Sequence, residues 1–285
     1  MNQLEALRLE WSALWDRCPG ATPFQSPEWL IPWWSVFGPG HLALVEVRER
    51  GRLTGLAPLY EEDGVRRFLG AGISDYQDIL AESDAAAAAI VERLRGARCD
   101  LLEVPQHSPL AACGAEASVC SVCPTVPLPA RRHRKRLADA SYEIERGPRH
   151  SEYLEALFRL HTAEWEKRSS PGVLADARVR DFHRLAAAAF AARGWLRLYG
   201  LRYEGALRAV LYAFAARKRV YLYLSGFDPE LSARSPGTRL LDFALEHSAE
   251  CGLAEADFLR GNEPYKYLWG ARDRPNYHVY FRSDG

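Results

Sequence analysis

The chain has 285 residues, of which 48% are hydrophobic and 26% are charged, a composition typical of globular proteins with one large domain or two. Lys plus Arg and Asp plus Glu both number 37, so the formal net charge is zero, which argues against a dedicated nucleic-acid-binding protein. No stretch approaches the roughly 18 consecutive apolar residues of a membrane span, and acids rather than an apolar segment follow the first Met. We expect a cytoplasmic protein with no membrane span.

The cysteines are few and scattered, as is usual in a reducing compartment. They are Cys18, Cys99, Cys113, Cys120, Cys123 and Cys251. Cys120 and Cys123 have the spacing of a metal-binding pair, but no second pair follows at a useful distance. We expect no metal site.

The first half of the chain predicts two helices followed by strands. Apolar spacing predicts a helix over residues 4–15, and an aromatic-rich helix follows the loop at 23–29. Two alternating apolar runs joined by a turn at Gly51 predict a β-hairpin over residues 42–60. The remaining predicted elements of this half are a strand at 67–70, an Ala-rich helix at 85–95 and a strand at 100–104.

Three prolines within residues 124–129 indicate a boundary, which we place between residues 128 and 129. The second half then predicts helices and strands in a similar order. The expected elements are helices at 151–168 and 177–193, a hairpin at 196–214, a strand at 220–224, a helix at 237–251 and a strand ending at 257–259.

The two predicted hairpins resemble each other at an offset of 154 residues. The identical pairs are Leu42/Leu196, Leu44/Leu198, Arg48/Arg202, Gly51/Gly205 and Leu53/Leu207. Both halves share the order strand, strand, strand, helix, strand, which predicts a tandem duplication. The alternative is two unrelated α/β halves that share a common hairpin pattern.

The helix expected near residue 237 begins with features of an anion-binding site. A helix N-terminus offers unpaired N–H groups and the positive end of a dipole. Gly237 permits close backbone approach, and Pro236 presets the backbone without removing a needed donor. The candidate cofactor-binding residues in this segment are Leu224, Gly226, Arg234, Ser235, Pro236, Gly237 and Thr238. An ordinary helix start is the alternative.

A second cluster follows the predicted strand at 257–259. Asp257, Arg260, Glu263, Tyr265 and Lys266 place five ionisable groups within ten residues, where a buried strand gives way to a loop. Catalytic groups often lie at such strand ends. The alternative is a solvated turn with one ion pair and an aromatic anchor.

The spacing of Arg234 and Gly237, after a strand and at a helix start, resembles the acyl-CoA pyrophosphate loop of GNAT acyltransferases. That loop usually has Gly or Ala at its sixth position, where this chain has Arg239. Together with residues 24–29, 72–78 and 257–269, the chain resembles the cellulose-biosynthesis (CelD/BcsL-type) acetyltransferases, a GNAT branch similar to Fem peptidyltransferases. The resemblance implies an α/β fold with two tandem GNAT-like domains, each with a mixed central sheet flanked by helices.

The resemblance also implies transfer of an acetyl or other acyl group from acyl-CoA to an amine or hydroxyl of a small molecule or saccharide, with acetyl-CoA as co-substrate. Such a reaction needs a base, an acid for the departing thiolate and a group that stabilises the oxyanion. We assign the base to Glu263 or Asp257, the acid to Tyr265 and the stabilising cation to Lys266. A structural role for Asp257 is the alternative.

The first half has no Arg-x-x-Gly sequence before its helix, and Glu82 and Asp84 would repel a phosphate. We therefore expect CoA to bind residues 129–285 and residues 1–128 to recognise the acceptor. The candidate acceptor-binding residues are Asp75, Tyr76, Asp78 and Arg260. A structural turn at 72–78 is the alternative.

A basic run spans residues 131–136 and could contact the CoA 3′-phosphate, an anionic acceptor or RNA, although a solvated helix start is the favoured interpretation. This run is the only support for a Fem-like aminoacyl transferase that uses charged tRNA. A third hypothesis is a non-catalytic binding protein with a GNAT fold.

Overall fold

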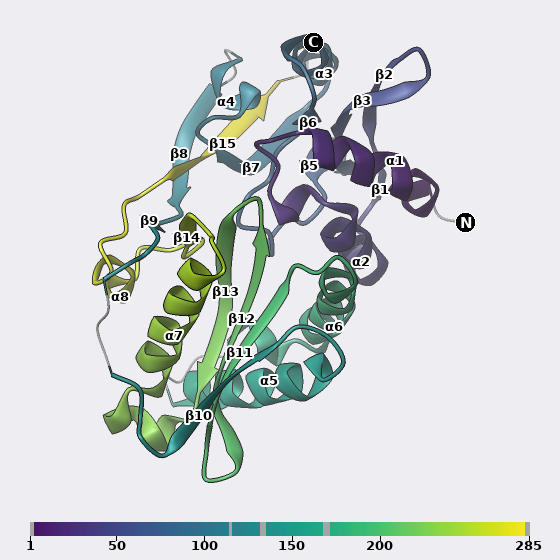
Figure 1. Ribbon diagram of the computed structural model, residues 1–285. Coiled ribbons are helices and arrows are strands. Elements are labelled where there is room, and N and C mark those ends of the chain that lie inside the picture. Colours follow the sequence, from purple (N-terminus) through teal and green to yellow (C-terminus); the bar gives the residue numbers. More distant parts are fainter. Residues whose placement is uncertain (1–2, 114–115, 132–134, 168–171, 283–285) are drawn as a thin grey trace. The chain divides into compact units, whose positions relative to one another are not determined.

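A computed structural model describes residues 3–113, 116–131, 135–167 and 172–282 (Figure 1). The chain divides into a first unit, residues 1–123 with 274–285, and a second unit, residues 124–273. The sequence-based division at 128/129 differs from this at both ends of the second unit. The reason is strand pairing, because β9 (Thr125–Pro127) joins the sheet of the second unit and β15 (Pro275–Phe281) joins the sheet of the first.

The first unit begins with helices and continues with short strands. In chain order its elements are α1 (Gln3–Arg17), η1 (Pro23–Gln25), α2 (Pro27–Phe37), β1 (His41–Leu42), β2 (Val45–Glu49), β3 (Arg52–Ala57), β4 (Leu59–Glu62), β5 (Val65–Phe68), β6 (Leu80–Ala81), α3 (Asp84–Arg95), β7 (Cys99–Pro105), α4 (Pro109–Ala112), β8 (Glu116–Val122) and, from the end of the chain, β15.

The second unit contains longer strands. Its elements are β9, β10 (Ala140–Glu145), α5 (His150–Glu166), η2 (Val173–Ala175), α6 (Ala177–Ala192), β11 (Leu196–Tyr203), β12 (Ala206–Ala216), β13 (Arg219–Phe227), η3 (Pro229–Arg234), α7 (Pro236–Glu250), β14 (Glu255–Asp257) and α8 (Pro264–Tyr267).

Both units have a mixed sheet. The first has the strand order β1-β4-β5-β7-β15-β8, with a second sheet β2-β3-β6, and the second has β10-β11-β12-β13-β14-β9. In each main sheet one pair is parallel, β5 with β7 and β13 with β14. The predicted fold class of two α/β units with mixed sheets is therefore confirmed.

The two hairpins have the same register at the offset of 154. Val45 pairs with Ala57 and Tyr199 pairs with Leu211, and both hairpins shift register at the same step, after Val47 and after Leu201. Both turns also have two successive residues with positive φ, at 50–51 and at 204–205. This shared geometry supports the predicted duplication.

The two sheet faces of the second unit are covered by different helices. Alternate residues of a strand point to opposite faces. On β12, Leu211 and Ala213 pack in one buried cluster with Leu240 of α7. The rings of the intervening Tyr212 and the next aromatic, Phe214, contact those of His183 and Phe190 on α6. Helix α7 therefore lies on one face and α6 on the other.

None of the helices in the described part of the chain is long and apolar enough to cross a membrane.

Candidate active site

Pairing between two parallel strands of the second unit ends early, and the unpaired stretch of β13 is called the β13–β14 gap below. Strands β13 and β14 pair from Arg219/Glu255 to Tyr221/Asp257. Strand β14 ends there, whereas β13 continues for six residues to Phe227 (Figure 1). The outer half of β13 therefore presents one edge that β14 does not cover, and an extended ligand could hydrogen-bond to such an edge.

A β-bulge lies at the point where the two strands part. Tyr212 pairs with Leu224 and Ala213 pairs with Leu222, which leaves Tyr223 as the extra residue. Bulges bend a strand and often lie next to active sites. The candidate Leu224 lies directly after this bulge and is partly exposed.

The start of α7 offers open backbone donors. Ser235 has a φ of 51° and makes no capping side-chain hydrogen bond, and Pro236 is the first helical residue. The first helical hydrogen bond runs from Arg239 N to Ser235 O at 3.2 Å. The amides of Gly237 and Thr238 therefore precede it and face the end of the helix, where an anion is stabilised.

Two arginines shape this loop. The Nη1 atom of Arg234 donates to the Tyr203 hydroxyl at 2.9 Å, and its guanidinium lies 5.0 Å from that ring's centroid while the residue stays exposed. Arg239 departs from the usual small residue, and its side chain donates to Arg234 O at 2.8 Å and to Lys135 O. The Arg239 side chain thus holds the loop in place by hydrogen bonds to backbone carbonyl oxygens.

The two candidate glycines have different surroundings. A Cβ on Gly237 would lie 3.2 Å from the Phe227 ring, so the glycine is close to a side chain that can shift. A Cβ on Gly226 would lie 2.6 Å from the backbone nitrogen of His161 on α5. Gly226 therefore allows β13 to pack against α5, and this role does not require a ligand.

The loop after β14 is held from inside by Lys266. Its Nζ donates to the carbonyl oxygens of residues 259, 260 and 261 at 2.9–3.0 Å and lies 2.8 Å from Glu263 Oε2. The residue is only 2% exposed. An ammonium has three donors, and this loop uses them. The geometry supports the interpretation that Lys266 fixes the loop.

Asp257 is also committed to the backbone. It is fully buried, and its Oδ1 accepts from the amide of Leu259, which has a φ of 58°. Such a backbone is uncommon for Leu and needs local support. The structure therefore favours the structural alternative for Asp257.

Tyr265 keeps its hydroxyl proton. Burial, followed by the negative charges of Glu263 and Glu164, raises the pKa of Tyr265 to about 12. Its ring meets the edge of Trp269, which donates to buried Asp242 of α7 at 2.9 Å. A protonated phenol could supply a proton to a departing thiolate. Glu164 on α5 was not among the predicted site residues, because a single acid on a helix gives no signal in the sequence.

Residues 74–79 of the first unit occupy the position that is open in the second. The amide of Gln77 donates to Glu103 O on β7 at 2.9 Å. Asp75 and Tyr76 are buried, and their carbonyl oxygens accept from Asn276 and Gln25. These contacts support the structural turn that was the alternative for this segment.

Asp78 belongs to the same turn. Its Oδ1 accepts from the Ser108 hydroxyl at 2.6 Å and from the Ile79 amide at 2.8 Å. Burial raises the pKa of Asp78 to about 7, well above the usual carboxyl value. Arg260, the fourth candidate for acceptor binding, lies in the second unit and is exposed.

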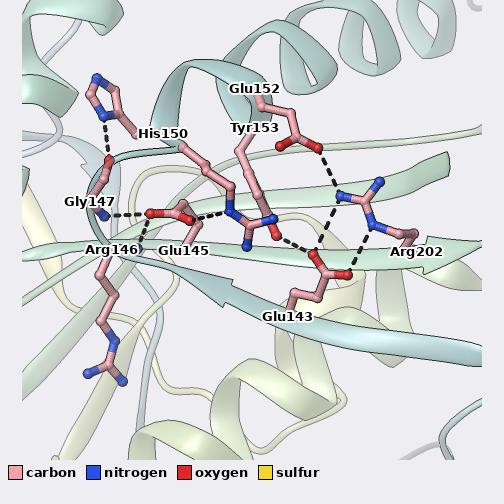
Figure 2. Close-up of polar contacts among 9 residues, drawn as sticks. Glu143, Glu145, Arg146, Gly147, His150, Glu152, Tyr153 and Arg202 are labelled. Atoms are coloured by element: carbon pink, nitrogen blue, oxygen red, sulfur yellow. Dashed lines mark hydrogen bonds and ion pairs between the residues drawn. The ribbon is translucent and has the colours of Figure 1, made fainter. Parts of the chain in front are cut away.

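A dense polar network joins β10, β11 and α5 (Figure 2). Glu143 accepts from the Tyr153 hydroxyl at 2.6 Å and from Arg202 Nε at 3.0 Å, and Arg202 also pairs with Glu152. Glu145 accepts from the amide of Gly147 and from Arg149. Because each carboxylate already has donors, this network is suited to holding the edge strand in place.

The basic run lies partly outside the described residues, at 132–134. Of the described members, Arg136 pairs with Glu246 at 2.8 Å and lies over the ring of Phe243. In the described part of the chain no group of His, Cys, Asp and Glu side chains could hold a metal ion.

Residues 129–267 match the family model described as an acetyltransferase (GNAT) domain. The match covers most of the second unit, including the gap, the start of α7 and α8. Together with the fold, it supports a GNAT acetyltransferase domain in this part of the chain. No curated protein matches the sequence.

Three solved structures are similar in fold over nearly the full length. FemX has a TM-score of 0.68 and 12% identity, covering 97% of this chain and 96% of that one. The C-terminal domain (DUF2156) of a putative lysylphosphatidylglycerol synthetase from Agrobacterium fabrum has a TM-score of 0.66 and 13% identity, covering 99% and 93%. A tandem GNAT protein from the clavulanic acid biosynthesis pathway has a TM-score of 0.53 and 17% identity, covering 96% and 94%. At these identities the similarity shows the tandem fold alone.

Proposed function

We propose that the protein is an acyltransferase that moves an acetyl or other acyl group from acyl-CoA to an amine or hydroxyl. The observation that carries the proposal is the combination of the β13–β14 gap and the uncapped start of α7 within the GNAT match. The pantetheine arm would extend along the free edge of β13. The pyrophosphate would accept from the amides of Gly237 and Thr238.

Tyr265 is the residue that we propose as the acid for the CoA thiolate. Like any tyrosine it is protonated at neutral pH, its raised pKa of about 12 extends this to alkaline pH, and it is half-exposed. Glu263 is exposed and remains the candidate base, although it also contacts Lys266. Lys266 and Asp257 support the loop that carries these residues.

In this proposal the acyl-CoA donor binds to the second unit alone. In the first unit, residues 74–79 lie beside the end of β7, and Ser83 caps α3 with its own side chain. Neither feature leaves the open backbone that a CoA site needs. The first unit would recognise the acceptor, a saccharide or small molecule in the cytoplasm, as the CelD-type resemblance implies. Asp75 and Tyr76 do not support this assignment, because both are buried.

A second candidate is an aminoacyl transferase that uses charged tRNA. The observation that favours this candidate is the similarity in fold to FemX over nearly the full length of the chain. The zero net charge weighs against it, and so does Arg136, which is already paired within the protein.

A thiol-release assay tests the proposal. Purified protein would be given a panel of acyl-CoAs with amino-sugar, sugar and amine acceptors, and free CoA would be measured. Acceptor-dependent release supports the acyl-CoA transferase. Binding of aminoacyl-tRNA but not of acetyl-CoA in isothermal titration would favour the second candidate, and binding of neither would contradict both.

A further inference from the structure

A free cysteine lies at the far end of α7 from the proposed donor loop. Cys251 directly follows the last residue of the helix and is exposed. A helix of this length spans about 22 Å. The surroundings of Cys251 are therefore separate from the proposed pyrophosphate site.

An imidazole stands within hydrogen-bond reach of this thiol. Cys251 Sγ lies 3.3 Å from Nε2 of His247, one turn earlier on α7. Arg146 Nη2 lies 2.9 Å from the same Nε2, and a guanidinium can only donate. The lone pair is therefore on Nε2 and the ring proton on Nδ1, which faces the Tyr199 hydroxyl at 3.1 Å.

The imidazole is neutral and oriented. Burial lowers the pKa of His247, and the nearby charges of Arg146 and Arg197 lower it further, while Glu250 acts weakly in the opposite direction. A nucleophile, a base within reach and a group that orients the base are the arrangement found at reactive cysteines. Cys251 thus has a proton acceptor that an isolated surface thiol lacks.

Two guanidinium groups add positive charge. Arg146 Nη2 lies 3.9 Å from Cys251 Sγ, and Figure 2 shows the Arg146 side chain extending away from the carboxylates of Glu143 and Glu145. Burial lowers the pKa of Arg197, and the charge of Arg146 adds to this. Among the described residues neither arginine has a carboxylate in ion-pair contact. Arg197 donates to the carbonyl oxygens of Gly194 and Leu196, so Arg146 is the cation in contact with the thiol, and its charge favours an anion there.

We propose that Cys251 is a site of thiol–disulfide exchange with low-molecular-weight disulfides that carry negative charge. The hydrogen bond from Arg146 to His247 Nε2 is released, the thiol proton passes to the freed lone pair of Nε2, and Sγ attacks one sulfur of the disulfide. A new S–S bond forms to Cys251 as the old one breaks, and the departing thiolate takes the proton from the imidazolium. Cys251 is oxidised to a mixed disulfide, and the other half of the reagent is reduced to a thiol.

The chain contains a matched control. Cys120 is also exposed and free, on β8 of the first unit. Its Sγ contacts the carbonyl oxygen of Asn276, and burial raises its pKa; the charge of Glu103 acts in the same direction, and a hydrogen bond with the Glu103 backbone acts in the opposite one. The two cysteines therefore differ in the sign of their electrostatic surroundings.

The test compares three disulfide reagents on the full-length protein at pH 7: dianionic 5,5′-dithiobis(2-nitrobenzoate), neutral 4,4′-dithiodipyridine and dicationic cystamine. Rates are assigned with Cys251→Ser and Cys120→Ser. We expect Cys251 to react at least about tenfold faster than Cys120 with the dianion, and this advantage to shrink to about threefold or less with cystamine. Glutathione disulfide should leave its mixed disulfide on residue 251 by mass spectrometry.

Two variants separate the contribution of the Arg146 charge to the reactivity of Cys251 from that of the His247 base. Arg146→Met should slow the dianion and leave the neutral reagent nearly unchanged, whereas His247→Phe should slow all three. Equal rates for the two cysteines with the dianion, or an unchanged charge preference in Arg146→Met, would overturn the proposal. If a variant fails to fold, the rates are measured on the wild-type protein at increasing ionic strength instead. Salt must then reduce the preference of Cys251 for the dianionic reagent, because it screens the charge of Arg146. A preference insensitive to salt would also overturn it.

Discussion

The two units share a hairpin with the same register and then diverge at the third strand. Phe68 pairs with Leu59, and Leu222 pairs with Ala213, which are equivalent positions at the offset of 154. Strand β5 ends at Phe68, but β13 continues for five residues beyond Leu222. The pairing register is therefore common to both units, although the counterpart of the continuous β12 is divided between β3 and β4, which lie in different sheets. The segment after the third strand then decides whether an open edge exists.

The segments after the third strand close one unit and leave the other open. In the first, Gly70 has a φ of 90° and its carbonyl accepts from Ser74, which turns the chain back toward β7. The Ser83 side chain then caps α3 by accepting from Ala86 N, and Asp84 stands in the first turn. Helix α7 has neither an acid in its first turn nor a side-chain cap at Ser235. A shared strand register therefore does not by itself leave an uncapped helix start and an open strand edge.

The largest expected effect concerns the loop that follows β14. Lys266→Met should lower the free energy of unfolding by about 3 kcal/mol, because three carbonyl oxygens lose their donor in a buried place. Urea denaturation measures this. The control Glu263→Gln removes an exposed partner and should cost less than about 1 kcal/mol. If Lys266→Met retains wild-type stability but loses turnover, Lys266 acts on the reaction instead.

Tyr265→Phe should reduce turnover about 100-fold while acetyl-CoA affinity stays within a few-fold, because the proton donor is lost and the ring remains. The raised pKa means that the phenol loses its proton only as the pH rises through about 12. Steady-state rates from pH 7 to 10 should therefore show no loss that depends on Tyr265. A normal rate in the Phe variant would remove Tyr265 from the mechanism.

Gly237→Val should weaken acetyl-CoA binding at least about tenfold, roughly 1.4 kcal/mol, since a side chain would obstruct the open amides. Titration calorimetry measures the affinity. The new Cβ would also approach Phe227, so melting temperature must be recorded for each variant. Gly96→Val, at the end of α3 where a Cβ meets nothing within 4 Å, is the control and should leave binding unchanged.

The equivalent arginines of the two hairpins should differ by about 1 kcal/mol in stability. Arg202 and Glu143 are each 25% exposed and share the network of Figure 2, whereas Arg48 and Glu10 are 35% and 46% exposed. Arg202→Met should therefore cost more than Arg48→Met in urea denaturation. Equal costs would show that the network adds nothing.

The pH dependence of the Arg202→Met cost has a definite sign. Burial opposes ionisation of Glu143, but hydrogen bonds from Tyr153 and Arg202 outweigh it and lower the pKa of Glu143. A carboxylate with a lowered pKa contributes stability that is present above its ordinary pKa and is lost as the pH falls through the folded-state value. The cost of Arg202→Met should accordingly shrink in acid.

Local patterns predicted most of the fold. The helices expected at 85–95 and 177–193 match α3 and α6 to within one residue. The hairpin expected at 42–60 contains the pair β2-β3, and the hairpin expected at 196–214 matches the pair β11-β12 to within two residues. Periodicity and turn glycines are local signals, which is why the sequence reveals them. Strand β15 was missed, since its place between β7 and β8 depends on pairing with residues far away in the chain. The strand expected to reach Leu259 ends at Asp257, because the backbone of Leu259 has a positive φ.

The candidate site was only partly predictable. The spacing of Arg234 and Gly237 located the start of α7, which depends on a short segment of the chain. The ionisable residues near 257–266 suggested a catalytic cluster. The sequence does not reveal that the Lys266 ammonium donates to three backbone carbonyl oxygens. Likewise, the sequence gives no sign that Asp75 is buried or that the pKa of Asp78 is raised.

Hydrogen–deuterium exchange with and without acetyl-CoA tests the central claim most directly, because it reports on both units in one experiment. We predict that acetyl-CoA slows exchange at residues 222–240, including the amides of Gly237 and Thr238, and leaves residues 68–86 unchanged. Protection of residues 68–86, or no protection at 222–240 under saturating acetyl-CoA, would contradict a donor site confined to the open strand edge and the start of α7.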